Sequence, residues 1–324
     1  MSEDLVQLAK SVRDFAGVAR KHAIKEIVGA FNPAGDNPSF CEDAAILEYD
    51  GDECLLLAAD GIWDRVMKAD PGWAGYCAIL ANVHDIYAMG GRPVAMVDVF
   101  SSSSDEVMRA VLKGMKAGID KFGVPVVGGH THPDTPYAAL DVAILGRVRK
   151  DNIIYSSRAI PGDDIVLAID LDGRVHPSGD MNWDSTFLKE ASVVRRQAES
   201  MIELGERRLL TSGKDVSNPG IIGTLGMILE ASGVGAEIKL GSIPKPFGPG
   251  YEQWLRMYPG MGFIMTCNPG NTASVLETFD KHGLAAEKIG RITQACLLDI
   301  TDGRERATVF DFSTDIITGQ KARK

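Results

Sequence analysis

Short apolar segments alternate with amphipathic segments along almost the whole sequence, and this alternation limits the fold more than any other feature. The apolar segments LLLAADG, VAMVDVF and YAALDVAILGRV have the length and composition of strands. Residues 72–90 and 104–122 have helical spacing instead, and glycine marks the end of each segment. Strands and helices in mixed order predict an α/β fold of the mixed α+β kind.

Turn sequences predict two β-hairpins and one domain boundary. The sequence DGD at residues 50–52 separates two apolar segments, and DG at residues 302–303 does the same near the C-terminus. Residues 149–164 combine charged with turn-forming residues and are the best position for a boundary. We therefore expect one domain over residues 1–150 and a second over residues 151–324.

Two further helices are expected in the second half of the chain. Residues 184–210 form a long amphipathic segment rich in Glu and Arg. After it, Ser217 or Asn218 can cap a helix that has Pro219 at its first position and ends at Gly233.

Charge and cysteine usage exclude several classes of protein. The 324 residues include 34 basic and 44 acidic side chains, a formal net charge of -10. A chain this acidic has little general affinity for nucleic acid or for an anionic membrane surface. The five cysteines contain no CxxC pair, which argues against a disulfide framework and a structural zinc site. No segment approaches the roughly 20 apolar residues that cross a bilayer. We expect a cytoplasmic protein without nucleic-acid or membrane partners.

Four aspartates lie beside small residues at the ends of expected elements: Asp43, Asp60, Asp85 and Asp215. Dispersed carboxylates of this kind suit Mg²⁺, which takes one or two carboxylates per site and keeps waters or phosphate oxygens as its other ligands. Each aspartate alone would equally fit a turn, a cap or a solvated charge. Only their conjunction predicts a metal and phosphate site.

Three segments are candidates for contact with phosphate. Gly128, Gly129, His130 and Thr131 follow an apolar strand, where backbone N–H groups can bind oxygen. Residues 215–218 lie at an expected helix N-terminus, and residues 20–25 form a cationic cluster. A plain turn, a plain cap and a solvated helix face are the competing interpretations. His130 and His132 could also be zinc ligands, but no thiolate or third histidine is close in sequence.

One helix and one thiol complete the set of candidates. Asn82 and Asp85 are three residues apart and so share a face of the helix expected over residues 72–90. Cys41 precedes Glu42 and Asp43, whose charges would raise the pKa of the thiol. A reactive thiolate at Cys41 is therefore disfavoured.

The order of several motifs is similar to that of a known superfamily. EDAAIL, LLLAADG, ANVHDIYAMGGRP, VPVVGGHT, PGDDIVLAI and DVSNPG, with ASGVGA after the helix, follow one another over residues 35–290. This order resembles the superfamily of aminoimidazole ribonucleotide synthetase, thiamine-monophosphate kinase, selenophosphate synthetase and a hydrogenase maturation factor. The closest likeness is to the aminoimidazole ribonucleotide synthetase-related group that includes methanogenesis marker protein 2.

The resemblance implies a two-domain chain whose N-terminal sheets pair in a homodimer to form a β-barrel, with ATP bound nearby. Asp43, Asp60, Asp85 and Asp215 look like the ligands of Mg²⁺, and Asp215 and Asp43 look like the catalytic carboxylates. Asn82, Gly128, Gly129, His130 and Thr131 would bind the nucleotide. The implied reaction is ATP-dependent phosphorylation or activation of an oxygen, by a phosphotransferase or a ligase/synthetase.

Departures from the family patterns leave the acceptor open. The segment GVARKHAIKE has no thiol of the selenophosphate synthetase kind, and Asn218 and His130 stand where thiamine-monophosphate kinase would have aspartates. The C-terminal sequence ITGQKARK lacks the reactive cysteine of the hydrogenase maturation factor. An enzyme like either kinase, or a nucleotide-binding maturation protein that acts on a partner protein, is the alternative to activation of a small metabolite. A degenerate structural dimer is a third interpretation, which the four aspartates disfavour.

Overall fold

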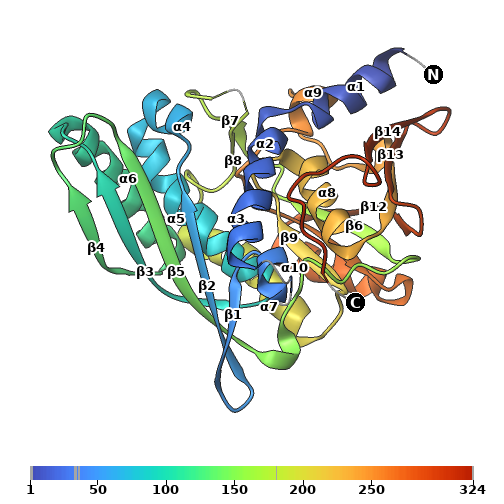
Figure 1. The fold of residues 1–324 in the computed structure, drawn as a ribbon, viewed down its shortest axis with the longest axis horizontal. Helices are drawn as coiled ribbons and strands as arrows, with labels where there is room; N and C mark the ends of the chain where they lie inside the picture. The colour runs from blue at the N-terminus through green and yellow to red at the C-terminus, as the bar shows by residue number, and fades with distance from the viewer. Residues whose placement is uncertain (1–2, 33–34, 36, 180, 323–324) are drawn as a thin grey trace.

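The computed structural model describes residues 3–32, 35, 37–179 and 181–322. The helices are α1 Glu3–Arg13, α2 Ala16–Ala19, η1 Arg20–Ala23, α3 Ile24–Phe31, η2 Pro38–Cys41, α4 Asp64–Ala69, α5 Pro71–Ala88, α6 Asp105–Phe122, η3 Lys150–Asn152, α7 Ala191–Glu206, α8 Gly220–Ser232, η4 Leu240–Ser242, α9 Tyr251–Trp254, η5 Pro269–Asn271 and α10 Thr272–His282. The strands are β1 Ala45–Asp50, β2 Glu53–Gly61, β3 Arg92–Ser101, β4 Val126–His132, β5 Ala139–Arg149, β6 Asp164–Ile169, β7 Arg174–Val175, β8 Trp183–Asp184, β9 Ser212–Asp215, β10 Gly235–Lys239, β11 Gly262–Cys267, β12 Ala285–Thr293, β13 Leu297–Thr301 and β14 Arg306–Asp311. Figure 1 shows two sheets side by side, one built from each half of the chain.

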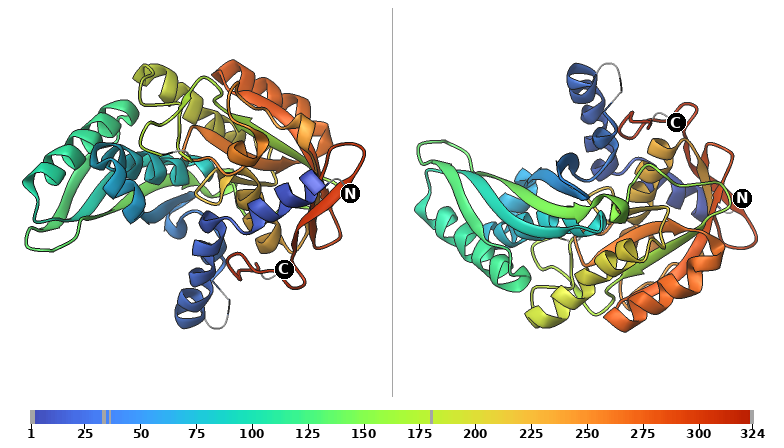
Figure 2. Two further views of the ribbon diagram at one scale, coloured as in Figure 1. Left: turned by 90° about the horizontal axis from the view of Figure 1, so that it is seen from above. Right: turned by 90° about the horizontal axis from the view of Figure 1, so that it is seen from below.

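The first sheet has the strand order β1-β2-β5-β3-β4. Its pairs are antiparallel except β3 with β4, which is parallel. Helices α5 and α6 cover one face, as Figure 2 shows, and α5 packs on β2, β3 and β5. No helix of the described residues packs on the other face, and large apolar side chains are exposed on β1, β2, β3 and β4. The sheet is open, with β1 and β4 at its edges.

The second sheet has the order β14-β13-β10-β12-β6-β11-β9, with β10 and β13 as its parallel pair. Helix α8 packs against β9, β10 and β11, while α10 packs on β6 and β12 beside α7. Strands β6 and β11 are buried along their whole length, as expected for apolar central strands between two helical layers.

The two sheets share one hydrophobic core. Helix α5 contacts α7 and β9 of the second half, and its buried side chains belong to the same cluster as those of β6, α7 and β11. A second cluster lies around α8, and the first helix α1 joins it through Leu5, Ala9 and Val12. The boundary between residues 150 and 151 remains a prediction, and α1 packs with the second half across it.

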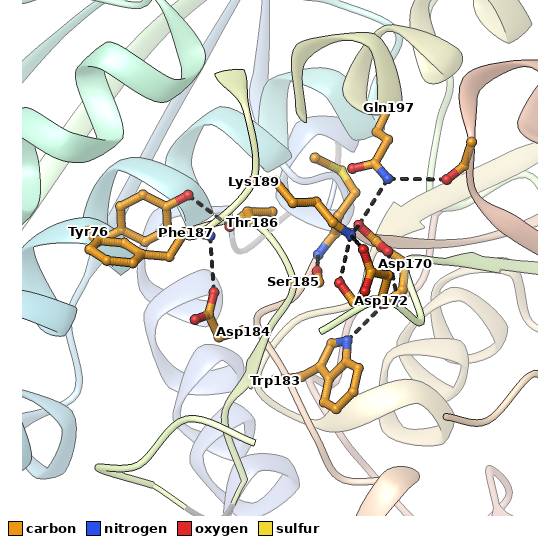
Figure 3. A network of polar contacts seen from close by, with 12 residues as sticks. Tyr76, Asp170, Asp172, Trp183, Asp184, Ser185, Thr186, Phe187, Lys189 and Gln197 are labelled. Carbon is orange, nitrogen blue, oxygen red and sulfur yellow. Dashed lines mark hydrogen bonds and ion pairs between the residues drawn. The ribbon is translucent and has the colours of Figure 1, made fainter. Parts of the chain in front are cut away.

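A polar network joins the halves beside this core. Lys189 Nζ forms an ion pair with Asp170 Oδ2 at 2.6 Å, and Gln197 Nε2 donates to the same oxygen at 2.9 Å. Figure 3 shows both side chains directed at Asp170. On the other side of this segment, Tyr76 of α5 donates through its hydroxyl to Thr186 Oγ1 at 2.8 Å. The network therefore fixes residues 184–190 between the two halves.

This network explains why the helix expected over residues 184–210 is shorter than predicted. Asp184 lies in β8, where it accepts from Phe187 N at 3.0 Å and pairs with Arg174 at 3.2 Å. Helix α7 begins only at Ala191 and ends at Glu206. The buried hydrogen bonds and ion pairs of residues 184–189 stabilise a non-helical conformation more than the spacing of their apolar side chains favours a helix.

Most other expected elements are present. The hairpins at residues 50–52 and 302–303 join β1 to β2 and β13 to β14, and α5 and α6 cover the two expected helices. The expected cap of α8 is wrong, because the helix begins at Gly220 and neither Ser217 nor Asn218 forms a side-chain cap. Gly233 does end this helix, in the left-handed conformation. Among the described residues, no helix combines the length and the hydropathy needed to cross a membrane.

The buried ion pair of the network predicts a large loss of stability when it is broken. Lys189→Met should lower the free energy of unfolding by about 3 kcal/mol, because Asp170 would remain buried without its cation. Lys116→Met is the matched control, since Lys116 pairs with Asp120 on the surface of α6 and should cost no more than about 0.5 kcal/mol. Urea denaturation of both variants measures the difference, and equal losses would contradict the role of the network.

Candidate functional site

The structure brings the four predicted aspartates to one cavity between the two halves of the chain. Carboxylate oxygens of Asp43, Asp85 and Asp215 all lie within 4.8 Å of one another. Asp60 lines the same cavity, whose volume is about 150 Å³. Asp43 precedes β1, Asp60 lies at the end of β2, Asp85 in the last turn of α5 and Asp215 at the end of β9. Residues far apart in the sequence therefore meet because α5 packs against β9.

Local contacts hold the loop that carries Asp43. The neighbouring Glu42 accepts hydrogen bonds from the backbone N–H of Ser156 and from Ser157 Oγ, the latter at 2.6 Å. Burial raises the pKa of Glu42, and these bonds partly offset that effect. Glu42 thus holds the loop that carries Asp43 against Ser156 and Ser157, which lie in the connection between the two sheets.

Two lysines supply positive charge to the cavity. Lys214 of β9 is buried, and its Nζ pairs with Asp43 Oδ1. Burial lowers the pKa of Lys214 to about 8, while the charge of Asp215 acts in the opposite direction. Lys21 of η1 also lines the cavity and forms no ion pair with any residue in the described part of the chain. Sequence reasoning missed Lys214, whose only signal is a lysine inside the short strand that ends at Asp215.

Repulsion and desolvation act together on the carboxyl groups. Burial raises the pKa of Asp85 far above its ordinary value, and the charges of Asp60 and Asp215 add to the shift. Desolvation also raises the pKa of Asp215 and of Asp60, although the charge of Lys21 lowers both. Asp43 Oδ2 and Asp215 Oδ1 are buried without a hydrogen-bond partner among the described residues. Such oxygens suit a divalent cation, which would satisfy them and reduce the repulsion.

A second chamber continues from the acidic cavity. The two share Lys21, Asp60, Asp215 and Ser217, and the second has a volume of about 80 Å³. Its walls are largely apolar and include Ile62, Trp63, Val66, Tyr258 and Pro259. The Arg20 guanidinium lies 4.5 Å from the centre of the Trp63 ring. An apolar chamber with a cation at its wall thus lies beside the carboxylates.

Polar atoms without partners line this second chamber. Ser217 Oγ, Asn218 Oδ1 and His84 Nε2 are buried and form no hydrogen bond within the described part of the chain. His84 packs between Phe122 and Phe263, and burial lowers its pKa to about 3. Its imidazole is therefore neutral. Buried polar atoms of this kind usually have a partner, so they indicate where a bound molecule would form hydrogen bonds.

The remaining candidates lie elsewhere. Asn82 is buried inside α5, donates to Ala78 O at 2.9 Å and lines neither chamber. Gly128, Gly129, His130 and Thr131 are exposed on the edge strand β4, three strands from Asp60 on β2. His130 and His132 face each other edge-on at 4.7 Å, and the described residues give them no third metal-binding side chain. Cys41 lines the acidic cavity, where burial, Glu42 and Glu230 raise its pKa to about 11. The predicted unreactive thiol fits this environment.

Comparison with known proteins decides the family. The model named AIR synthase related protein, N-terminal domain, matches residues 41–148, and the C-terminal domain model matches residues 161–303. The chain belongs to the AIR synthase-related family. The predicted superfamily is thereby confirmed, and the narrower likeness to methanogenesis marker protein 2 remains a prediction.

Two relatives of known sequence match the chain at different levels of identity. The chain is 42% identical over 322 residues to the uncharacterized protein MJ0640 of Methanocaldococcus jannaschii, covering 98% of this chain and 99% of that protein. It is 28% identical over 229 residues to the selenide, water dikinase of Carboxydothermus hydrogenoformans, covering 68% of this chain and 64% of the dikinase.

Solved structures share the fold. T. maritima PurL complexed with ATP has a TM-score of 0.71 at 17% identity, over 87% of this chain. This family member spans only about half of the PurL chain, 47%. AaThiL complexed with AMPPCP and TMP has a TM-score of 0.65 at 17% identity, over 88% of this chain and 96% of AaThiL. The TM-scores show a common fold, and identities of 17% do not show a common reaction.

The raised pKa values predict that the carboxylates destabilise the metal-free protein at neutral pH. A carboxyl group whose pKa is raised by folding stabilises the fold while it is protonated, and this contribution is lost as the pH rises through the raised pKa. Asp85→Asn should therefore increase the free energy of unfolding by about 1–3 kcal/mol at pH 8 in chelator, and by less at pH 5.

Thermal unfolding at both pH values tests this expectation. Asp120→Asn is the control, because Asp120 is exposed on α6 and pairs only with Lys116 in this structure. A decrease in stability for Asp85→Asn at pH 8 would show that the charged carboxylate of Asp85 does not destabilise the fold.

Proposed function

We propose that the protein is a Mg²⁺-dependent enzyme that uses ATP to phosphorylate or activate an oxygen of a small metabolite. The observation that carries the proposal is the convergence of Asp43, Asp85 and Asp215, with Asp60 in the same cavity. Three adjacent carboxylates, two of which have a buried oxygen without a partner among the described residues, fit Mg²⁺, the ion that accompanies phosphoryl groups in most such reactions.

The charged residues divide into two roles. Asp43, Asp60, Asp85 and Asp215 would hold the metal, which neutralises the transferred group. Lys214 and Lys21 would neutralise phosphate oxygens, because they are the cations that line the cavity. Asp215 lies at the opening between the two chambers, so it is also placed to orient an acceptor hydroxyl and take its proton.

ATP is the nucleotide that the relatives favour. Solved structures show PurL complexed with ATP and AaThiL complexed with AMPPCP, and the selenide, water dikinase is a kinase by name. Gly128, Gly129, His130 and Thr131 expose backbone and imidazole groups on β4, whereas Asn82 is fully buried and lines neither chamber. In this proposal the phosphates lie at the carboxylates, the four residues of β4 bind the rest of the nucleotide, and Asn82 makes no direct contact with it.

The second chamber favours a small acceptor over a protein-borne one. It is narrow, its walls are mainly apolar, and three buried polar atoms within it lack partners. A small molecule can fill such a space completely, whereas a folded partner protein could insert only a terminal segment. The maturation protein that acts on a partner therefore ranks second.

The open sheet supports assembly as a homodimer. Val94, Val97 and Val99 on β3 and Val127 on β4 are all more than 40% exposed on the face that no helix covers. Contiguous apolar surface of this kind usually marks an interface. Pairing of two such sheets would give the β-barrel that the family resemblance implies.

Metal-dependent nucleotide binding tests the proposed site. Calorimetric titration with a non-hydrolysable ATP analogue should give micromolar binding in Mg²⁺ and at least about tenfold weaker binding in chelator. Asp43→Asn, Asp60→Asn and Asp85→Asn should each weaken the Mg²⁺-dependent binding by about tenfold or more, because each removes one charged ligand. Asp120→Asn should bind like the wild type. Unchanged binding in all three aspartate variants would refute the assignment of the metal site.

Light scattering tests the dimer. Val97→Asp combined with Val127→Asp should give monomers, because charges placed on two adjacent strands would be buried without partners in the interface. Leu112→Asp, on an exposed position of α6, should leave the mass unchanged. A monomeric wild type would refute the barrel.

A further inference from the structure

The C-terminal segment forms part of the wall of the acidic cavity. Thr318 and Gln320 line this cavity together with Met227 and Ala231 of α8. The segment does not belong to any strand or helix, so side-chain and backbone contacts alone must keep it in place. We call residues 316–322 the tail.

One buried carboxylate holds the tail. The Glu230 residue of α8 is 2% exposed, and every hydrogen bond to its carboxylate within the described part of the chain comes from three consecutive tail residues. Its Oε1 accepts from Ile317 N at 3.0 Å and from Gly319 N at 3.2 Å. Its Oε2 accepts from Thr318 N and Thr318 Oγ1, both at 2.7 Å.

The carboxylate of Glu230 relies on the tail for the contacts that compensate its burial. No cation pairs with Glu230 in the described part of the chain, and it lies in the last turn of α8, where the helix dipole disfavours negative charge. Three N–H groups and one hydroxyl are its compensation for burial, and without them a charged group would remain without partners. Docking of the tail and burial of Glu230 are therefore coupled.

The backbone of the tail is shaped for this contact. Gly319 has a φ of 73°, which allows consecutive N–H groups to converge on one anion. Lys25 of α3 packs on the other side, since a β-carbon at Gly319 would lie 3.0 Å from Lys25 Cγ. Two more bonds complete the arrangement, from Gln320 N to Thr318 Oγ1 at 3.2 Å and from Ala322 N to Ala231 O at 2.9 Å.

We propose that Glu230 is a positioning residue of the active site, which holds the tail so that Thr318 and Gln320 complete the wall around the phosphate end of the nucleotide. The proposal rests on the proposed function, because that function supplies the ligand. Glu230 itself lines neither chamber. Its effect passes through the tail, which borders the cavity that Asp43, Asp85 and Asp215 line.

Three variants separate this role from a general loss of structure. Glu230→Gln keeps the size of the side chain but directs an amide NH₂ at backbone N–H groups. A chain that ends at Asp315 removes the tail, and the third variant combines both changes. Glu237→Gln is the matched control, because Glu237 is a glutamate of the same half that pairs with Arg306 and lines neither chamber.

Hydrogen exchange followed by mass spectrometry, run without nucleotide, reports docking of the tail. Exchange in residues 316–322 should be at least about tenfold faster in Glu230→Gln than in the wild type or in Glu237→Gln. Unchanged exchange in Glu230→Gln would overturn the proposal, because another contact would then hold the tail.

Calorimetry with the Mg²⁺-bound ATP analogue reports the consequence for the site. Glu230→Gln and the shortened chain should each bind about tenfold more weakly, and the combined variant no more weakly than the shortened chain. A released tail with wild-type affinity would overturn the positioning role while leaving the proposed function intact. Absence of binding in the wild type would refute the proposed function first, and the role of Glu230 with it.

Discussion

Electrostatic repulsion between buried carboxylates is the constraint on which the rest of the structure depends. Asp43, Asp85 and Asp215 have oxygens within 4.8 Å of one another, and Asp60 lines the same cavity. Within the described ranges of the chain, Lys214 forms an ion pair with Asp43 alone. Water would solvate these groups separately in an unfolded chain, so folding must hold them together against their own repulsion. A cavity of this kind stores free energy that a bound cation releases.

The contacts between the two halves provide the opposing force. Helix α5 carries Asp85 and packs on β9, which carries Lys214 and Asp215. The hydrogen bond of Tyr76 to Thr186 joins the same two halves at a distance from the cavity, and the ion pair of Lys189 with Asp170 holds the segment that carries Thr186. The apolar core and the polar network thus keep the carboxylates close, and only a rigid junction could do so.

Sequence reasoning predicted those parts of the site whose signal is local. The four aspartates were found because each stands at the end of an element, and the hairpin at residues 50–52 because Gly51 permits a tight turn. It could not find Lys214, whose burial depends on the packing of β9 against the loop of Asp43. It misjudged residues 184–189 and the cap of α8, where tertiary contacts replace the local pattern. Glu230 carried no signal either, because its partners lie about 90 residues away along the chain.

The residues around the acidic cavity belong to two groups, those on packed elements and those in the end segments of the chain. This division indicates how one fold could bind different acceptors. The carboxylates stand on α5, β2 and β9, or directly before β1, and these elements are held by a continuous core. Part of the wall comes from the two ends of the chain, Lys21 and Ile24 near the start and Thr318 and Gln320 near the end, beside Met227 and Ala231 of α8. Sequence changes at these four wall positions would alter the shape of the cavity, and none of the four belongs to the buried apolar residues of the two core clusters. Under the proposed function, the packed elements would carry the metal and phosphate chemistry, and the chain ends and the apolar chamber beside Asp215 would determine the acceptor.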